Sequence, residues 1–335
     1  MAATQQTPVY SAYIVSGGTK YNVTPAIIEI DRSDSEKQIA QRVTLRLMNV
    51  QVNGSWLAGI FKPRDRVFLN ANDGTKTEEV FRGYLWSRTY ESSTNDREIK
   101  LVCYDNLIYM QESDDSLYFS SGKSTKDVVS SICSKWGVKL SYSYNSITHS
   151  KLPLRGNLYD IFTADILDLV KKKTGKKYVV LSERDTMHVK PQGANTTIYH
   201  FLAGKNVIKT ASGWTMEGVV TKVVIVGKAN DDGKEPIEAT YTGDTKKYGT
   251  LQRILTGSDS TSLAEAKEEA QYAIKENGAP KWEYEVTAPD VPWIRKGDKV
   301  YVSAGDITKK YLIVISVERT FDGKNCEMIL TLRDV

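Results

Sequence analysis

The strongest constraint on the fold is a two-residue period that runs through the first third of the chain. From Tyr10 to Asp105, short runs of alternating apolar and polar residues are separated by turn-forming residues rich in Gly, Asn and Asp. Segment 42–47, Arg-Val-Thr-Leu-Arg-Leu, places its apolar side chains on one face of a strand and its polar side chains on the other. This pattern is typical of an antiparallel sheet with one face in solvent. About six such strands without a clear helix predict a small barrel or sandwich, and we assign residues 1–110 to an N-terminal tube-like β-barrel.

The period changes to that of a helix after this barrel. Segment 124–137 has apolar residues at helical spacing, behind a Ser-x-x-Asp start signal and before a glycine. A second apolar stripe at 158–170 predicts another helix, with Gly175 placed to cap its end. A strand hairpin is expected at 177–190. We therefore predict a small α/β insert domain at 111–195.

Strand signals return after the insert and continue to the end of the chain. Segment 198–202 reads as a strand, and the almost continuously apolar segment 219–226 is expected to be a central strand buried on both faces. A Ser-x-x-Glu capping box then opens an alanine-striped helix at 262–277. We predict a second tube-like β-barrel domain at 196–335 with this helical insertion, so the fold class is mainly β with an α/β insert (α+β).

The last two expected strands, 311–317 and 326–332, form a hairpin whose two faces both carry apolar residues. One apolar face can fill a barrel, whereas the other requires cover by the alanine-striped helix or by another subunit. Aromatic residues cluster in the same domain, and for them burial in the core is an equal alternative to subunit contact. The candidate assembly interface consists of Trp282, Tyr284, Trp293, Tyr301, Leu312, Val314 and Ile329.

Composition and motif chemistry favour a structural protein over an enzyme. The 45 Lys and Arg residues balance 41 Asp and Glu residues and are dispersed, without the basic face that nucleic-acid binding requires. The segment Gly122-Lys123-Ser124-Thr125 lacks the glycine of a phosphate-binding loop, because Leu117 stands at that position.

The three histidines and three cysteines have no ligand-like spacing, and no apolar run approaches the roughly 20 residues of a membrane span. We expect no catalytic residues, metal site, cofactor, sequence-specific nucleic-acid binding or direct membrane insertion.

Five segments occur in an order that is informative as a set: LVCYDNL at 101–107, TGKKY at 174–178, VVIVG at 223–227, KYGTLQ at 247–252 and IRKGDKV at 294–300. Their order and spacing resemble the XkdQ/YqbQ hub family of contractile phage tails and phage-tail-like bacteriocins, over nearly the whole chain. One departure is Thr221-Lys222, where the family pattern has an asparagine before the apolar run.

The resemblance implies a structural baseplate hub, in which a homotrimer forms a ring of six similar barrels that joins the tail tube to the central spike. Implied partners are the tail tube protein, the spike, the C-terminus of the tape-measure protein, and LysM-bearing or wedge baseplate proteins. The chain would be made in the bacterial cytoplasm and released by lysis within a virion, a defective prophage particle or a bacteriocin. The alternative function is a cell-wall-associated hydrolase or carbohydrate-binding module, suggested by the nineteen tyrosines and many acidic residues.

Overall fold

The computed structural model describes residues 7–52, 54–93, 97–143, 146–256 and 263–335. The chain forms two compact units, of which the first contains Met1–Ala211 and Tyr284–Val335 and the second contains Ser212–Glu283. The first unit has three apolar cores, which lie in a first barrel, an α/β insert and a second barrel.

The first barrel follows the alternation of its sequence. Its sheet has the strand order β3-β4-β9-β8-β7-β1-β2, and neighbouring strands are antiparallel. Alternate side chains such as Val43, Leu45 and Leu47 are fully buried, as predicted. The elements are β1 (Val9–Ser16), β2 (Thr19–Asn22), η1 (Thr24–Ala26), β3 (Ile27–Ser35), β4 (Arg42–Met48), β5 (Gln51–Val52), β6 (Ser55–Trp56), α1 (Leu57–Ile60), β7 (Arg66–Asn72), β8 (Thr77–Ser92) and β9 (Arg97–Tyr104).

The insert contains both predicted helices and the predicted hairpin. Ser124 and Asp127 form the expected capping box, and Gly175 ends the second helix with a φ of 70° in the left-handed region. The pairs β10–β12 and β11–β14 were not predicted from the sequence. The elements are α2 (Ile108–Gln111), β10 (Asp114–Phe119), α3 (Thr125–Lys135), β11 (Lys139–Tyr142), β12 (Leu152–Asn157), α4 (Leu158–Asp160), the π-helical η2 (Ile161–Leu167), α5 (Asp168–Thr174), β13 (Tyr178–Glu183) and β14 (Thr186–Pro191).

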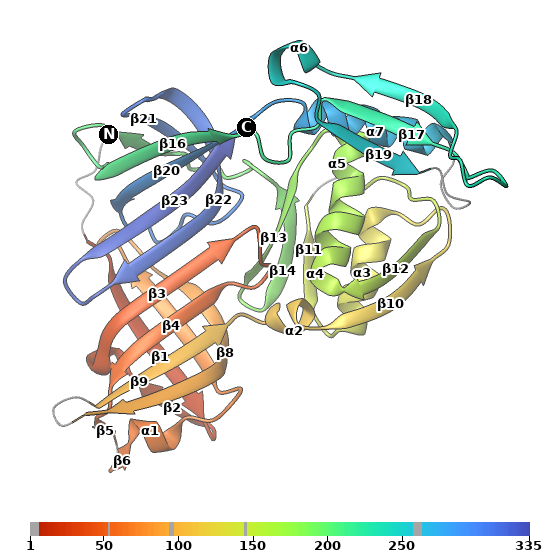
Figure 1. Cartoon of the computed structure of the whole chain (residues 1–335). Helices are drawn as coiled ribbons and strands as arrows, with labels where there is room; N and C mark the ends of the chain where they lie inside the picture. The colour runs from red at the N-terminus through yellow and green to blue at the C-terminus, as the bar shows by residue number, and fades with distance from the viewer. Residues whose placement is uncertain (1–6, 53, 94–96, 144–145, 257–262) are drawn as a thin grey trace. The chain divides into compact units, whose positions relative to one another are not determined.

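The second barrel shares one sheet with the first. Its strands are β15 (Tyr199–Leu202), β16 (Lys209–Thr215), β20 (Lys281–Pro289), β21 (Lys299–Ala304), β22 (Ile307–Phe321) and β23 (Cys326–Asp334). The long strand β22 pairs with β21 as far as Ile313 and with β3 of the first barrel from Ser316 onward (Figure 1). Within the described residues, thirteen strands therefore form a single sheet around two cores.

A β-bulge in β22 corrects one sequence prediction. Val314 pairs with Leu332 and Ser316 with Thr331, so Ile315 is an extra residue that reverses the alternation of the strand. Leu312 and Val314 consequently face the same core as Val317, and all three side chains are fully buried. The prediction that Leu312 and Val314 lie on a different face from Val317 is wrong, because strict alternation was extended through the bulge. Ile313, on the opposite face, is also buried.

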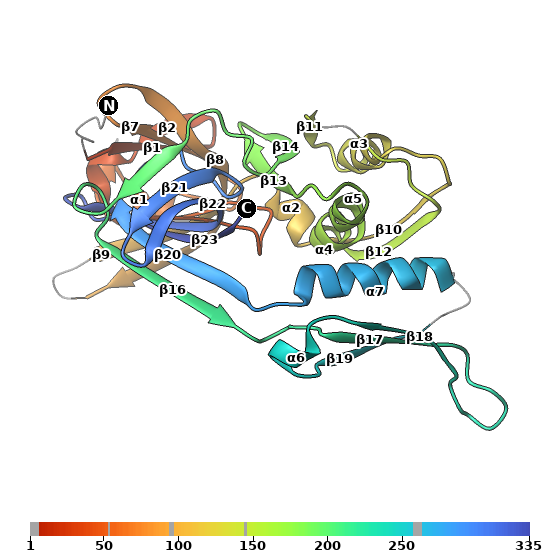
Figure 2. The ribbon, with the colours of Figure 1, turned by 90° about the horizontal axis from the view of Figure 1, so that it is seen from above.

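The second unit has a core of its own. The elements that lie wholly within it are β17 (Lys222–Val226), β18 (Ile237–Thr242), α6 (Thr245–Tyr248), β19 (Gln252–Thr256) and α7 (Leu263–Asn277). As predicted, β17 is the central strand and is buried on both faces. The alanine stripe of α7 packs closely along this sheet (Figure 2). The predicted capping residue Ser262 lies outside the described residues, and the compact unit is larger than the insertion predicted at 262–277.

Candidate functional site: the junction of the barrels

The loop between β20 and β21, residues 290–298, contacts all three parts of the first unit, and we call it the junction loop. Trp293 donates a hydrogen bond of 2.9 Å to Asp73 in the first barrel. Arg295 donates from Nη1 to the carbonyl oxygen of Ser182 in the insert, at 3.4 Å. The loop itself belongs to the second barrel, so its side chains join the two barrels and the insert.

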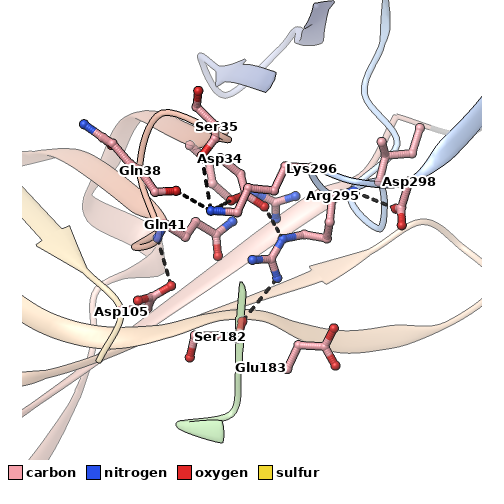
Figure 3. A network of polar contacts seen from close by, with 12 residues as sticks. Asp34, Ser35, Gln38, Gln41, Asp105, Ser182, Glu183, Arg295, Lys296 and Asp298 are labelled. Carbon is pink, nitrogen blue, oxygen red and sulfur yellow. Dashed lines mark hydrogen bonds and ion pairs between the residues drawn. The ribbon is translucent and has the colours of Figure 1, made fainter. Parts of the chain in front are cut away.

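Asp34, on the inner face of β3, is the anionic centre of this junction. Its fully buried carboxylate accepts a 2.5 Å hydrogen bond from Arg295 Nε and lies 3.5 Å from Lys296 Nζ (Figure 3). Burial alone would raise the pKa of Asp34, but the two cations hold it well below its ordinary range. Lys296 also donates to three carbonyl oxygens at the end of β3 and in the loop that follows it, those of Ser35, Gln38 and Ile39.

A second buried group surrounds Asp290 at the start of the junction loop. Its carboxylate accepts hydrogen bonds from Arg319 Nε, at 2.7 Å, and from the Tyr10 hydroxyl. Arg32 donates to the carbonyl oxygen of Pro292. Burial, together with the nearby Arg319 guanidinium, lowers the pKa of Arg32 to about 10. These contacts join β1 and β3 of the first barrel to β22 and the junction loop.

The energetics of these groups explain why they occur as sets. Moving one charged side chain out of water costs several kcal/mol, so a buried ion is tolerated only with a charged partner and hydrogen bonds. The cations Arg295, Lys296 and Arg319 meet this requirement only when the two barrels and the loop are in place together. The arrangement therefore fixes the geometry of the first unit.

Sequence analysis missed these junction residues, although a signal was present. Arg32 and Asp34 continue the inward positions of β3 that begin with Ile30, and Arg319 continues the inward positions of β22. A charged residue at an inward position of a two-residue period indicates a buried ion pair.

The insert is also joined to both barrels by polar contacts nearer the surface. Arg333 of β23 forms a 2.7 Å ion pair with Glu36 and donates to the side chain of Gln192. On the first barrel, Arg66 forms a 2.6 Å ion pair with Asp185 at the tip of the β13–β14 hairpin. The insert therefore has polar contacts with each barrel in addition to those of the junction loop.

The residues of the predicted assembly interface fall into two groups. Tyr284, Leu312 and Val314 are buried in the core of the second barrel, so these three are not available for contact with another subunit. Trp293 is partly buried at the junction, where it donates to Asp73.

Trp282 and Ile329 are exposed, with 46% and 39% of their surface accessible. Tyr301 is partly exposed on the outer face of the second barrel, where its ring lies between those of His200 and Tyr311. The residues of the set that lie outside the core and the junction are therefore Trp282, Tyr301 and Ile329.

The described residues contain no group of three or more His, Cys, Asp or Glu side chains that could hold a metal ion. Among the helices in the described part of the chain, none has the length and apolar character needed to cross a membrane. All three cysteines are buried free thiols.

Known proteins share both sequence and fold with this chain. The phage-like element PBSX protein XkdQ of Bacillus subtilis (strain 168) is 24% identical over 288 residues, which cover 82% of this chain and 86% of that protein. The 43 kDa tail protein of prophage MuSo2 from Shewanella oneidensis superposes with a TM-score of 0.70 at 14% identity, covering 97% of this chain and 98% of that one.

A third similar protein is E. coli c3393, which is described as a component of the type VI secretion system with structural similarity to the T4 tail proteins gp27 and gp5. It superposes with a TM-score of 0.57 at 8% identity, covering 92% of this chain and 74% of that one. At these identities the two solved structures show a common fold. The family model described as YQBQ-like matches residues 33–333, and the chain therefore belongs to the YQBQ-like family.

Proposed function

We propose that this chain is the hub protein of the baseplate of a phage tail or phage-tail-like particle, with a structural and not an enzymatic role. In this proposal three copies form a ring that joins the tail tube to the spike and ends the tape-measure channel. The observation that carries it is the pairing of β22 with β3, which makes two barrels into one continuous sheet. Three such chains supply six barrels, the number that the hub family places in one ring.

The buried junction supports a role that requires mechanical rigidity. Residues 290–298 bind the first barrel and the insert through largely buried ion pairs and hydrogen bonds. The two barrels of one chain would then enter a ring as one body. The names of the relatives, a phage-like element protein and a prophage tail protein, agree with this role.

The contacts between copies are proposed to include the exposed residues Trp282 and Ile329 and the partly exposed Tyr301. Large apolar side chains left in solvent at several places on a surface are favourable contact points for a partner. Tail tube and spike proteins are the proposed partners at the two faces of the ring.

Light scattering coupled to size exclusion, with negative-stain imaging, tests the proposal on the purified full chain alone and mixed with tube and spike proteins. We expect trimers or ring-shaped particles in at least one of these samples. A chain that stays monomeric and binds neither partner would contradict the proposal. Lysis or binding of purified peptidoglycan by the chain alone would favour a wall-directed function instead.

A further inference from the structure

The long strands β8 and β22 have the same design in the two barrels. Each has a bulge against the strand that follows it in the chain, and the extra residue is Trp86 in β8 and Ile315 in β22. Before this bulge, β8 pairs with β7 and β22 pairs with β21. Beyond it, β8 continues along β9 and β22 continues along β23. The first and the second barrel therefore repeat one arrangement around this strand.

The loops that lead into β7 and β21 repeat as well. They are residues 62–65 and 295–298, and both end in aspartate. In each loop the aspartate carboxylate accepts a hydrogen bond from the backbone N–H of the first loop residue, at 2.7 Å and 2.8 Å. The third residues, Arg64 and Gly297, have φ of 69° and 84°. Their N–H groups donate to the β8 and β22 carbonyl oxygens just before the bulge, at 2.8 Å and 2.7 Å. The repeat therefore extends to individual hydrogen bonds.

The two repeated strands differ along one edge beyond the bulge. In β22, residues 316–321 pair with β3 on that edge. The corresponding residues 87–92 of β8 pair with β9 alone among the strands that the structure describes. Tyr90 in this half of β8 is 44% exposed, and Trp86 at the bulge is 42% exposed. Such an edge leaves backbone N–H and C=O groups without a strand partner and is a template for pairing with another chain.

The strand β16 is the counterpart of β3. The order β3-β4-β9-β8 in the first barrel is repeated as β16-β20-β23-β22 in the second. Within the described residues, β16 is the last strand on its side of the sheet. Ile208, directly before it, donates from its backbone N–H to Thr287 O of β20 at 2.8 Å and is 56% exposed. The chain therefore has two open strand edges, one on β8 and one on β16, that match the two edges joined within it by β22 and β3.

We propose that residues 87–92 of β8 in one copy pair with β16 of the neighbouring copy, in the antiparallel way that β22 pairs with β3 inside each chain. This inference rests on the proposed ring. A closed ring of identical chains needs two different surfaces on each chain that fit one another, and the two open edges supply them. A second copy is the occupant because the β22–β3 pair shows that an edge of the β8 type accepts a strand of the β16 type. The pairing extends the sheet from each copy into the next.

Hydrogen exchange on the full chain tests this pairing without any substitution. Rings, formed with tube or spike protein where the ring requires it, are compared with monomers at the same pH. We expect amides of residues 87–92 and 209–211 to exchange at least about tenfold more slowly in the ring. The strand β2, which ends the sheet on its other side, is the internal control and should exchange equally in both samples.

Cross-linking identifies the strand of the neighbour. Thr89 and Ala211 are exposed residues of the two edges, and the three native cysteines are buried. In rings of the double variant Thr89→Cys/Ala211→Cys, a short bismaleimide should join neighbouring chains into covalent dimers and trimers. The matched control is Thr89→Cys/Lys151→Cys, whose second cysteine is at an exposed position of the insert, and it should give single chains.

The outcomes separate this pairing from the ring itself. Rings in which residues 87–92 exchange as fast as in the monomer would overturn the pairing and leave the ring proposal intact. Equal cross-linking of the double variant and its control in intact rings would have the same meaning. Absence of any ring, with and without tube and spike proteins, would overturn both proposals.

Discussion

At the scale of single residues, the first unit depends on charged side chains that lie inside a β structure. Lys296 is 1% exposed and donates to three backbone carbonyl oxygens at the end of β3 and in the loop that follows it. Thr221 shows the same principle in the second unit. Its buried hydroxyl donates to Gly249 O at 2.7 Å and accepts from Leu251 N at 2.8 Å, which fixes the start of β17.

Asp105 gives a pH-dependent prediction. Burial raises the pKa of its carboxyl group from 3.8 to about 6, so the folded state favours the protonated form. Its contribution to stability is fully present below pH 3.8 and is lost as the pH rises through about 6. Asp105→Asn removes this dependence. The quantity to measure is the difference in free energy of unfolding, wild type minus variant. This difference should fall by about 3 kcal/mol as the pH rises from 3.5 to 7.

Urea unfolding at several pH values measures this difference. Asp114→Asn, at an exposed position of β10, is the matched control and should leave the pH profile of the wild type unchanged. Parallel profiles for the wild type and Asp105→Asn would show that Asp105 does not titrate in this range.

At the scale of elements, the long strand β22 decides how the barrels meet. Its first half completes the second barrel and its second half pairs with β3, and the bulge at Ile315 lies between the two halves. A bulge increases the local twist of a strand, which lets one strand serve two differently curved parts of a sheet. Because of the bulge, Leu312 before it and Arg319 after it both lie on the inner face of the strand.

Leu312 and Ile329 test this bulge, because strict alternation would place them on one shared outer face. In the structure Leu312 is fully buried and Ile329 is 39% exposed. Leu312→Ala should lower the free energy of unfolding by about 2–5 kcal/mol. Ile329→Ala, the matched control on the paired strand, should lower it by less than about 1 kcal/mol. Urea denaturation of the monomeric chain measures both, and similar losses would contradict the assigned register.

At the scale of the whole molecule, the first unit has three apolar cores but one set of buried ion pairs. Each of Asp34, Asp290 and Arg319 has a partner that belongs to another part of the sheet or to the junction loop. Unfolding one barrel would leave charges of the other part buried without partners, which costs several kcal/mol. We therefore expect the barrels and the insert to unfold together, while the second unit has an apolar core of its own.

Asp34→Asn tests this coupling by hydrogen exchange. Removal of the charge leaves Arg295 and Lys296 buried without their anion, at a cost of about 3–5 kcal/mol. Amides in β4, β13 and β21 should all lose protection by at least about a hundredfold, because about 1.4 kcal/mol corresponds to a factor of ten. Amides of β17 in the second unit provide the internal control and should exchange as in the wild type. Loss of protection in the first barrel alone would show that the junction does not couple the parts.

The sequence by itself determined the elements whose signals are local. The alternation of β4, the capping box at Ser124 and the αL glycine at 175 depend on neighbours in the chain, and each was predicted before the fold was known. The mainly β class follows from the same local periods.

Only the tertiary structure decided the features that depend on residues far apart in sequence. These are the change of partner along β22, the position of its bulge, and the pairing of Asp34 with Arg295 across 261 residues. A charged residue in an alternating strand has the same local pattern whether it faces solvent or a buried counterion. Its environment depends on the three-dimensional approach of the second barrel, and for this physical reason the junction was missed while the strands that carry it were found.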